Sequence, residues 1–178
     1  HNYVPAYPAR VDPYLGETAS DNQLVTVAGE DVLPDLHIGR LPAASAEQAA
    51  AVVDKIVRYE TTPWPGWWAR RMLFVADNAD PGGSFPTLSD ALYDAYLPDQ
   101  ITGNRVYLTP DADEGHEYDP SDAADVERAR AAVANYLGYG QLLASYIGHA
   151  SHSQWAQEIL LHRDDVPDLG NGAVSYTH

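Results

Sequence analysis

The sequence predicts an α/β protein, in which a parallel sheet flanked by helices is preceded by part of a smaller α/β lobe. From residue 70 onward, short apolar runs of strand length alternate with longer segments of helical periodicity. A segment with two prolines and three tryptophans, residues 61–68, separates this alternation from the elements before it. Strand–helix–strand order favours right-handed crossovers, and therefore a parallel sheet with helices on both faces.

The smaller lobe is expected to contain two short strands and one helix. Residues 23–27 alternate polar and apolar side chains, and residues 36–40 form a second short run of the same kind. Ser45 is a suitable N-cap residue for a helix whose apolar side chains share one face as far as Tyr59. Residues before these strands show little periodicity.

The larger lobe is expected to contain three strands and two helices. The first strand is a continuous apolar run and the last is mostly apolar, which is typical of a sheet that is buried on both faces. In chain order, the expected elements are a strand near 71–76, a helix at 88–97, a strand near 104–108, a helix from Pro120 to Leu137 and a strand near 141–147. The acidic residues 111–119 between the second strand and its helix predict a solvated loop.

Polar residues follow two of these strands at the point where each strand ends. Asp77 comes directly after the 71–76 strand, and His149 follows the 141–147 strand and Gly148. The carboxyl ends of parallel strands meet at one edge of a sheet, where α/β proteins place their chemistry. A carboxylate there would set the tautomer of the imidazole and stabilise its charged form. Spacing alone leaves two alternatives open: His149 as a surface histidine and Asp77 as a turn residue.

Composition restricts the partners and the chemistry. The net charge of −16 argues against nucleic acid or an anionic membrane as a partner. The sequence has no apolar run long enough for a membrane span and no signal peptide, and we expect it to be an excised or mature segment. With no cysteine, it offers no disulfide, no thiolate metal site and no thiol nucleophile of its own.

Metal chemistry is a weaker alternative, and no cofactor is expected. A metal-dependent hydrolase would draw its ligands from His149, His152, Glu158 and His162. Their spacing matches no familiar zinc motif. Calcium is the ion that acidic side chains could hold in a structural role, and the candidates are Asp80, Asp111, Asp113, Glu114 and Asp119. No twelve-residue calcium loop is visible, and solvated surface is the simpler interpretation.

Several motifs occur together in an order that is specific to one family. They are Ser-Asp-Asn-Gln at 20–23, Leu-Pro-Asp-Leu-His-Ile-Gly-Arg-Leu-Pro at 33–42, Val-Asp-Lys-Ile-Val-Arg-Tyr-Glu at 53–60, Leu-Phe-Val-Ala-Asp at 73–77, and Tyr-Ile-Gly-His-Ala-Ser at 146–151 with Trp155. By these motifs the chain resembles the gingipain family of cysteine peptidases over nearly its whole length. The resemblance implies a caspase-like fold. Residues 1–62 would then be the C-terminal part of an N-terminal α/β subdomain, and residues 63–178 the N-terminal part of the caspase-like catalytic subdomain.

The resemblance also implies roles for the residues at the strand ends. His149 matches the family's catalytic histidine, and Asp77 matches the acid that orients it. Gly148 and Ala150 match the oxyanion and substrate site, although Ala150 replaces a glycine of the family motif. The nucleophilic cysteine would close the next strand, which begins near residues 174–177.

The implied protein is a secreted or cell-surface bacterial endopeptidase that acts on proteins or peptides. This chain would be a fragment that is inactive by itself, because the nucleophile and the C-terminal remainder of the catalytic domain are missing from it. The resemblance does not extend to specificity for basic residues, since residues 84–88 contain no acid where arginine-cleaving members carry one, and Asp90, the acid nearest to that segment, aligns poorly. A non-catalytic pseudo-peptidase or binding module of a larger surface protein is the alternative.

Overall fold

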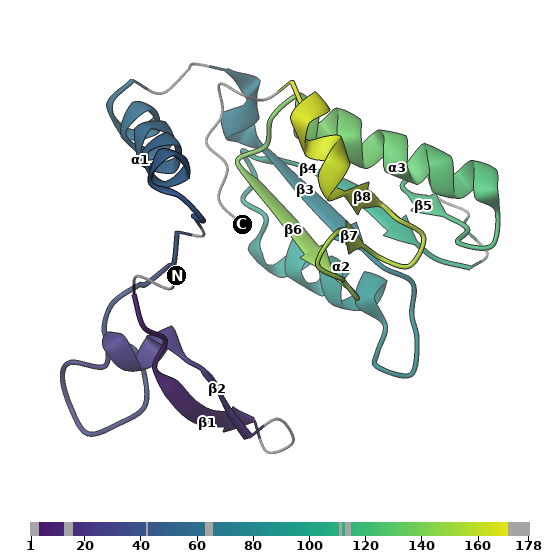
Figure 1. Cartoon of the computed structure of the whole chain (residues 1–178). Helices are drawn as coiled ribbons and strands as arrows, with labels where there is room; N and C mark the ends of the chain where they lie inside the picture. The colour runs from purple at the N-terminus through teal and green to yellow at the C-terminus, as the bar shows by residue number, and fades with distance from the viewer. Residues whose placement is uncertain are drawn as a thin grey trace. The chain divides into compact units, whose positions relative to one another are not determined.

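The computed structural model describes residues 4–12, 16–41, 43–62, 66–110, 112 and 115–170. The chain divides into two compact units, His1–Thr61 and Thr62–His178. Figure 1 shows both, and each is described by itself.

Unit 1 combines a hairpin with a helix. Strands β1 (Pro8–Asp12) and β2 (Gly16–Ala19) pair antiparallel, and the 3-10 helix η1 (Asp21–Leu24) follows them. Helix α1 (Ala46–Thr61) begins as the sequence predicts, because the Ser45 hydroxyl accepts the backbone N–H of Gln48 at 3.2 Å. The hairpin lies in the segment for which periodicity predicts no element.

The predicted strand at residues 23–27 is wrong. Its residues form η1 and the loop after it, and a side chain takes the backbone donors that a strand would use. The Asp35 carboxylate accepts the N–H groups of Val27 and Ala28 at 2.7 and 2.8 Å. A carboxylate that satisfies the main chain locally competes with strand pairing, which explains the failure of the alternation rule here.

The predicted strand at residues 36–40 is also wrong, since these residues belong to no helix or strand. Arg40 holds this segment through its side chain. Its guanidinium donates to both carboxylate oxygens of Asp21 at 2.8 and 2.7 Å, and to the Val4 carbonyl at 2.7 Å. The apolar residues of the segment, Leu36 and Ile38, remain exposed.

Unit 2 contains the predicted parallel sheet. Its elements are η2 (Trp67–Arg70), β3 (Arg71–Ala76), α2 (Phe85–Tyr96), β4 (Thr102–Leu108), β5 (Glu117–Tyr118), α3 (Ala123–Gly138), β6 (Leu143–Ile147), β7 (Gln154–Trp155), β8 (Leu161–His162) and η3 (Arg163–Asp168). Four strands form one parallel sheet in the order β5-β4-β3-β6. This confirms the α/β class, with the helix-flanked parallel sheet expected of a caspase-like fold.

The core lies on both faces of the sheet, because side chains of the central strand alternate between them. Leu73 and Val75 of β3 pack with residues of α3, whereas Phe74 and Ala76 pack on the opposite face with residues of α2. Figure 1 shows these two helices on opposite sides of the strands. A strand segment that is buried on both faces has no polar positions, which is why residues 72–76 of β3 are a continuous apolar run.

Three boundaries in unit 2 differ from prediction. Helix α2 begins at Phe85 rather than residue 88, after the N-cap Ser84. Helix α3 begins at Ala123 rather than Pro120, because the Asp122 carboxylate accepts the Ala124 N–H at 2.8 Å. The segment predicted as linker, 61–68, ends inside η2, where Trp68 is buried.

Short elements were missed. Strand β5 lies within the predicted acidic loop, and β7 and β8 form an antiparallel pair after His149. The strand predicted to begin near 174–177 falls outside the described residues. Within the part of the chain that the structure describes, every helix is too short or too polar to cross a membrane.

Candidate active site

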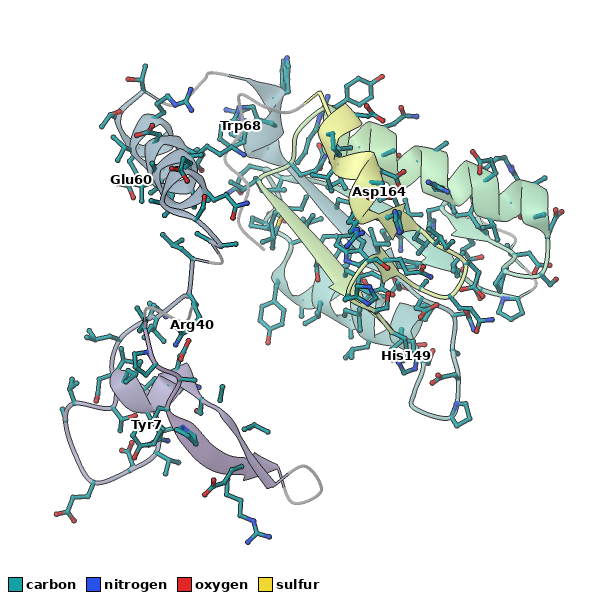
Figure 2. All side chains as sticks on the ribbon, in the orientation of Figure 1. Tyr7, Arg40, Glu60, Trp68, His149 and Asp164 are labelled. Atoms are coloured by element: carbon teal, nitrogen blue, oxygen red, sulfur yellow. The ribbon has the colours of Figure 1, made fainter. Side chains whose placement is uncertain are left out.

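His149 and Asp77 lie at the carboxyl ends of adjacent strands, β6 and β3. The two strand ends are joined by a hydrogen bond from the Asp77 N–H to the Ile147 carbonyl, at 3.0 Å. Figure 2 shows His149 at one end of unit 2 and Trp68, before β3, at the other. The parallel topology therefore brings the two residues to one edge of the sheet, as their positions in the sequence predict.

Asp77 holds the main chain of the histidine loop. Its side chain is buried, at 4% exposure. One carboxylate oxygen accepts the backbone N–H of His149 at 3.1 Å, and the other accepts that of Asn78 at 2.9 Å. The expected hydrogen bond between Asp77 and the imidazole is thus replaced by one to the histidine backbone, because Asp77 is buried beneath the loop.

Asp80 provides the carboxylate that contacts the imidazole. Its Oδ2 lies 2.6 Å from Nε2 of His149. A tight turn places Asp80 there: the N–H of each of Asp80 and Gly83 bonds to the carbonyl of the other at 3.0 Å, and the Gly82 N–H donates to Oδ1 at 2.6 Å. The hydrogen bond from His149, and then that from Gly82, lower the pKa of Asp80. The carboxylate therefore stays ionised beside the ring.

The carbonyl of His149 is held from the other side. It accepts the Tyr146 hydroxyl at 2.5 Å and the Ala156 N–H at 2.9 Å. The Tyr146 ring stacks on Trp155, with centroids 4.6 Å apart. Burial, and then the nearby Asp77 charge, raise the pKa of Tyr146, so its hydroxyl remains a donor. The histidine backbone is consequently fixed at both its N–H and its carbonyl.

The imidazole itself is accessible. The His149 side chain is 68% exposed. The Phe85 ring packs against the imidazole in a T-shaped contact, with ring centroids 5.3 Å apart. Nε2 is occupied by Asp80, whereas Nδ1 makes no hydrogen bond to any residue that the structure describes. A histidine with one nitrogen held by a carboxylate and the other free has the arrangement of a general base.

Gly148 is required by the close approach of Asp77. A Cβ at this position would lie 2.3 Å from the Asp77 Cβ and 2.7 Å from the Tyr146 hydroxyl oxygen. Its φ of +157° also disfavours other residues. The structure therefore gives Gly148 a steric role in the loop, and its oxyanion or substrate role stays a prediction.

Ala150 presents an unused backbone donor next to the exposed imidazole. The residue is exposed and forms an isolated antiparallel bridge with Trp155. Its N–H donates to no backbone carbonyl among the described residues. Its predicted oxyanion role also stays a prediction, and the free N–H is the group that such a role requires.

Sequence reasoning missed Asp80 and Tyr146 as parts of this site. The sequence did contain a signal for the position of Asp80. Asp-Pro-Gly-Gly at 80–83 is a strong turn sequence, and such a turn folds the polar loop back on itself. No sequence signal distinguishes Asp77 from Asp80 as the partner of the ring. For Tyr146 the sequence contains no such signal, because tyrosine is a common residue in strands.

The candidate metal ligands do not assemble into a site. Among the residues that the structure describes, no group of three acidic or histidine side chains could hold a metal ion. His162 instead caps η3, accepting the Asp164 N–H on Nδ1 at 3.2 Å. Of the calcium candidates, Asp80 bonds to His149, and Asp119 accepts both the N–H and the hydroxyl of Ser121. Asp111, Asp113 and Glu114 are outside the described residues.

Replacing Asp80 by asparagine should remove the preference of the neutral His149 ring for the tautomer with its proton on Nε2. In the wild type with a neutral imidazole, the carboxylate should keep the proton on Nε2. As the pH falls, the contact should persist, because the lowered pKa keeps Asp80 ionised below its ordinary value of 3.8. The contact should be lost only as the pH drops through that lowered value. Long-range ¹⁵N NMR of the imidazole measures both effects.

Asp77→Asn is the matched control, since Asp77 contacts the backbone of His149 and not its ring. It should leave the imidazole nitrogen shifts close to those of the wild type. An unchanged tautomer in Asp80→Asn, or an equal change in both variants, would show that Asp80 does not control the ring.

Comparison with known proteins gives one match. The family model for peptidase family C25 matches residues 1–178. No curated protein and no solved structure matches the chain significantly.

Proposed function

This chain belongs to peptidase family C25, the gingipain family, and from that premise we propose that it carries the histidine part of a cysteine endopeptidase active site. The nucleophilic cysteine is supplied by residues outside this sequence, which contains none. The observation that carries the proposal is the state of His149. Its ring is exposed and held at Nε2 by Asp80, with Nδ1 free.

Asp80 selects the reactive nitrogen. A carboxylate accepts the proton of Nε2–H, which leaves the lone pair of the neutral ring on Nδ1. Nδ1 is then the atom that takes a proton from a thiol. Asp77 acts one step further away, by holding the main chain from which the ring projects. We therefore assign the orienting role to Asp80 and a positioning role to Asp77.

The topology offers a place for the nucleophile. Strand β6 is the outermost strand of the described sheet, next to β3. A further parallel strand on that side of β6 would end at the same edge as His149. A cysteine at its end would lie beside the free Nδ1, as a base and a nucleophile must.

The reaction then follows from the groups present. Nδ1 of His149 accepts the thiol proton, and the thiolate attacks the carbonyl carbon of the peptide bond. The Ala150 N–H donates to the developing oxyanion. His149 returns the proton to the leaving amine, and water hydrolyses the thioester with the same base.

Proteins or peptides are the substrates that we propose, without a preference for basic residues. A pocket for a basic side chain needs an unpaired acid near the catalytic histidine. Asp90, the acid nearest to residues 84–88, forms an ion pair with Arg105 at 3.0 Å. Its charge is already compensated.

A non-catalytic binding module is the second candidate. It is favoured by the absence of cysteine from the sequence and by Ala150, which adds a methyl group beside the oxyanion position. In a module of this kind the His149–Asp80 pair would hold the loop in place and would have no catalytic role.

Peptidase assays distinguish the two candidates. The longer protein that contains this chain should cleave casein, and a thiol-reactive inhibitor should stop the cleavage. The chain by itself, as the matched control, should show no inhibitor-sensitive cleavage. Failure of the longer protein to cleave, or to react with a thiol-directed probe, would favour the binding module. Inhibitor-sensitive cleavage by the isolated chain would contradict the proposed location of the nucleophile.

A further inference from the structure

A cavity with a mixed polar and aromatic lining lies at the edge of the unit 2 sheet opposite His149. Its volume is about 570 Å³. It is formed where η2 leads into β3, beside the start of β4 and the end of α3. The residues that matter for its chemistry are Trp67, Arg70, Arg71, Gln100, Asn104 and Tyr139.

The cavity contains two arginines that pair with no acidic side chain in the part of the chain that the structure describes. Unit 2 has six basic residues, all arginine. Four of them, Arg105, Arg128, Arg130 and Arg163, pair with aspartates. Arg70 and Arg71 form no ion pair with any described residue, although acidic residues outnumber basic ones 26 to 10 in the sequence. Both unpaired arginines of unit 2 therefore line the same cavity.

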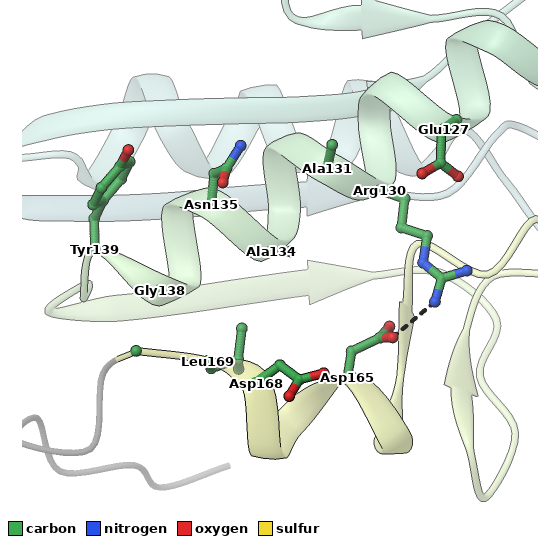
Figure 3. Close-up of a pocket in the computed structure, with 11 residues that line it drawn as sticks. Glu127, Arg130, Ala131, Ala134, Asn135, Gly138, Tyr139, Asp165, Asp168 and Leu169 are labelled. Atoms are coloured by element: carbon green, nitrogen blue, oxygen red, sulfur yellow. Dashed lines mark hydrogen bonds and ion pairs between the residues drawn. The ribbon is translucent and has the colours of Figure 1, made fainter.

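A second cavity shows what a compensated site looks like. It is a groove between α3 and η3, and Figure 3 shows Arg130 reaching across it to Asp165. The two side chains are 2.7 Å apart. Glu127 and Asp168 add negative charge to the same groove. Its one arginine is neutralised, so it offers nothing to an anionic ligand.

We propose that the Arg70–Arg71 cavity binds a carboxylate side chain of an acidic peptide segment, as an exosite remote from His149. Guanidinium groups bind carboxylates with two parallel hydrogen bonds, which favours arginine over other cations in such sites. The amides of Gln100 and Asn104 can donate to and accept from a peptide backbone.

The walls of the cavity suit a peptide better than a bare anion. Trp67 is 74% exposed and Tyr139 is 71% exposed, so both rings offer apolar surface to a ligand. Exposed aromatic side chains near arginine are typical of surfaces that bind proteins. The volume is also in the range of small-ligand sites, and a single phosphate would leave most of it empty.

Titration of the purified chain with short peptides tests this proposal without catalysis. A labelled glutamate-rich peptide should bind, and its glutamine counterpart should bind at least about tenfold more weakly, because the charged hydrogen bonds are lost. The double variant Arg70→Gln/Arg71→Gln should lose at least about the same factor. Binding should weaken as salt is raised. Tryptophan fluorescence should change on binding in the wild type and should change less in Trp67→Phe, because the chain contains three other tryptophans.

The matched control is Arg10→Gln/Arg58→Gln, which removes the same charge from two exposed residues of unit 1. It should keep wild-type affinity for the glutamate peptide. Equal loss in both double variants would show that only net charge matters and would overturn the proposal. Equal binding of the two peptides by the wild type would also overturn it, whether or not the variants fold. Phosphate binding that is lost in Arg70→Gln/Arg71→Gln, when neither peptide binds the wild type, would assign the cavity to a different anion and overturn the proposal. No measurement in this experiment requires cleavage. The exosite proposal can therefore be rejected without rejecting the proposed peptidase activity, and the reverse also holds.

Discussion

Replacing His149 by alanine should abolish cysteine-dependent hydrolysis in the longer protein that joins this chain to its nucleophile. Among the described residues, His149 is the base at this edge of the sheet that has one ring nitrogen held by a carboxylate while its side chain stays exposed, and the substitution removes it. Loss of a general base lowers turnover by about 10²–10⁴-fold, and more when the base also activates the nucleophile. Folding should change little, because the side chain is 68% exposed.

The matched control is His152→Ala, an exposed histidine in the same loop. It should keep nearly full activity. Turnover should be measured with a fluorogenic peptide, and the thermal unfolding of each variant should be recorded alongside. Activity in His149→Ala above a few per cent of wild type would remove His149 from the mechanism. Equal losses in both variants would point to damage to the loop rather than to loss of a base.

Gly148→Ala should give the largest loss of stability among substitutions in the histidine loop. The new methyl group would lie 2.3 Å from the Asp77 Cβ, which is buried and cannot move away without exposing the end of β3. Overpacking of this kind costs about 1–3 kcal/mol in the free energy of unfolding, and we expect the upper end of that range. The displaced loop should also lose the hydrogen bond from the His149 N–H to Asp77.

Gly115→Ala is the control for this substitution, since a Cβ at Gly115 meets no atom within 4 Å. Its free energy of unfolding should change by no more than about 0.5 kcal/mol, as at other surface positions. Urea denaturation measures both variants. If Gly148→Ala were as stable as Gly115→Ala, the contact between Gly148 and Asp77 would not constrain the loop.

The sheet of unit 2 could be predicted because its central strand is buried on both faces. Burial on two sides removes polar positions, and residues 72–76 of β3 and 106–108 of β4 are therefore continuous apolar runs. Their parallel order follows from the helices between them. Strands β5, β7 and β8 span two residues each, which is too short for any periodicity.

Unit 1 shows why the same rules failed outside that sheet. The alternation at 23–27 predicts a strand, but Asp35 satisfies the backbone N–H groups of Val27 and Ala28 from outside the segment. At 36–40 a single arginine holds the chain through its side chain. Side-chain hydrogen bonds between residues far apart in the sequence leave no periodic pattern, so strand prediction had no means of detecting them.

For the site, the sequence determined which strand ends carry polar residues, and hence that Asp77 and His149 share one edge of the sheet. This followed because parallel strands separated by helices end on the same side. The choice of partner for the imidazole was decided only by the tertiary structure. Asp77 is nearer to the strand end and is buried under Gly148, so its oxygens reach the backbone of His149 and not the ring. The turn at 80–83 brings Asp80 back to Nε2, and a contact of 2.6 Å depends on that three-dimensional path rather than on residue order.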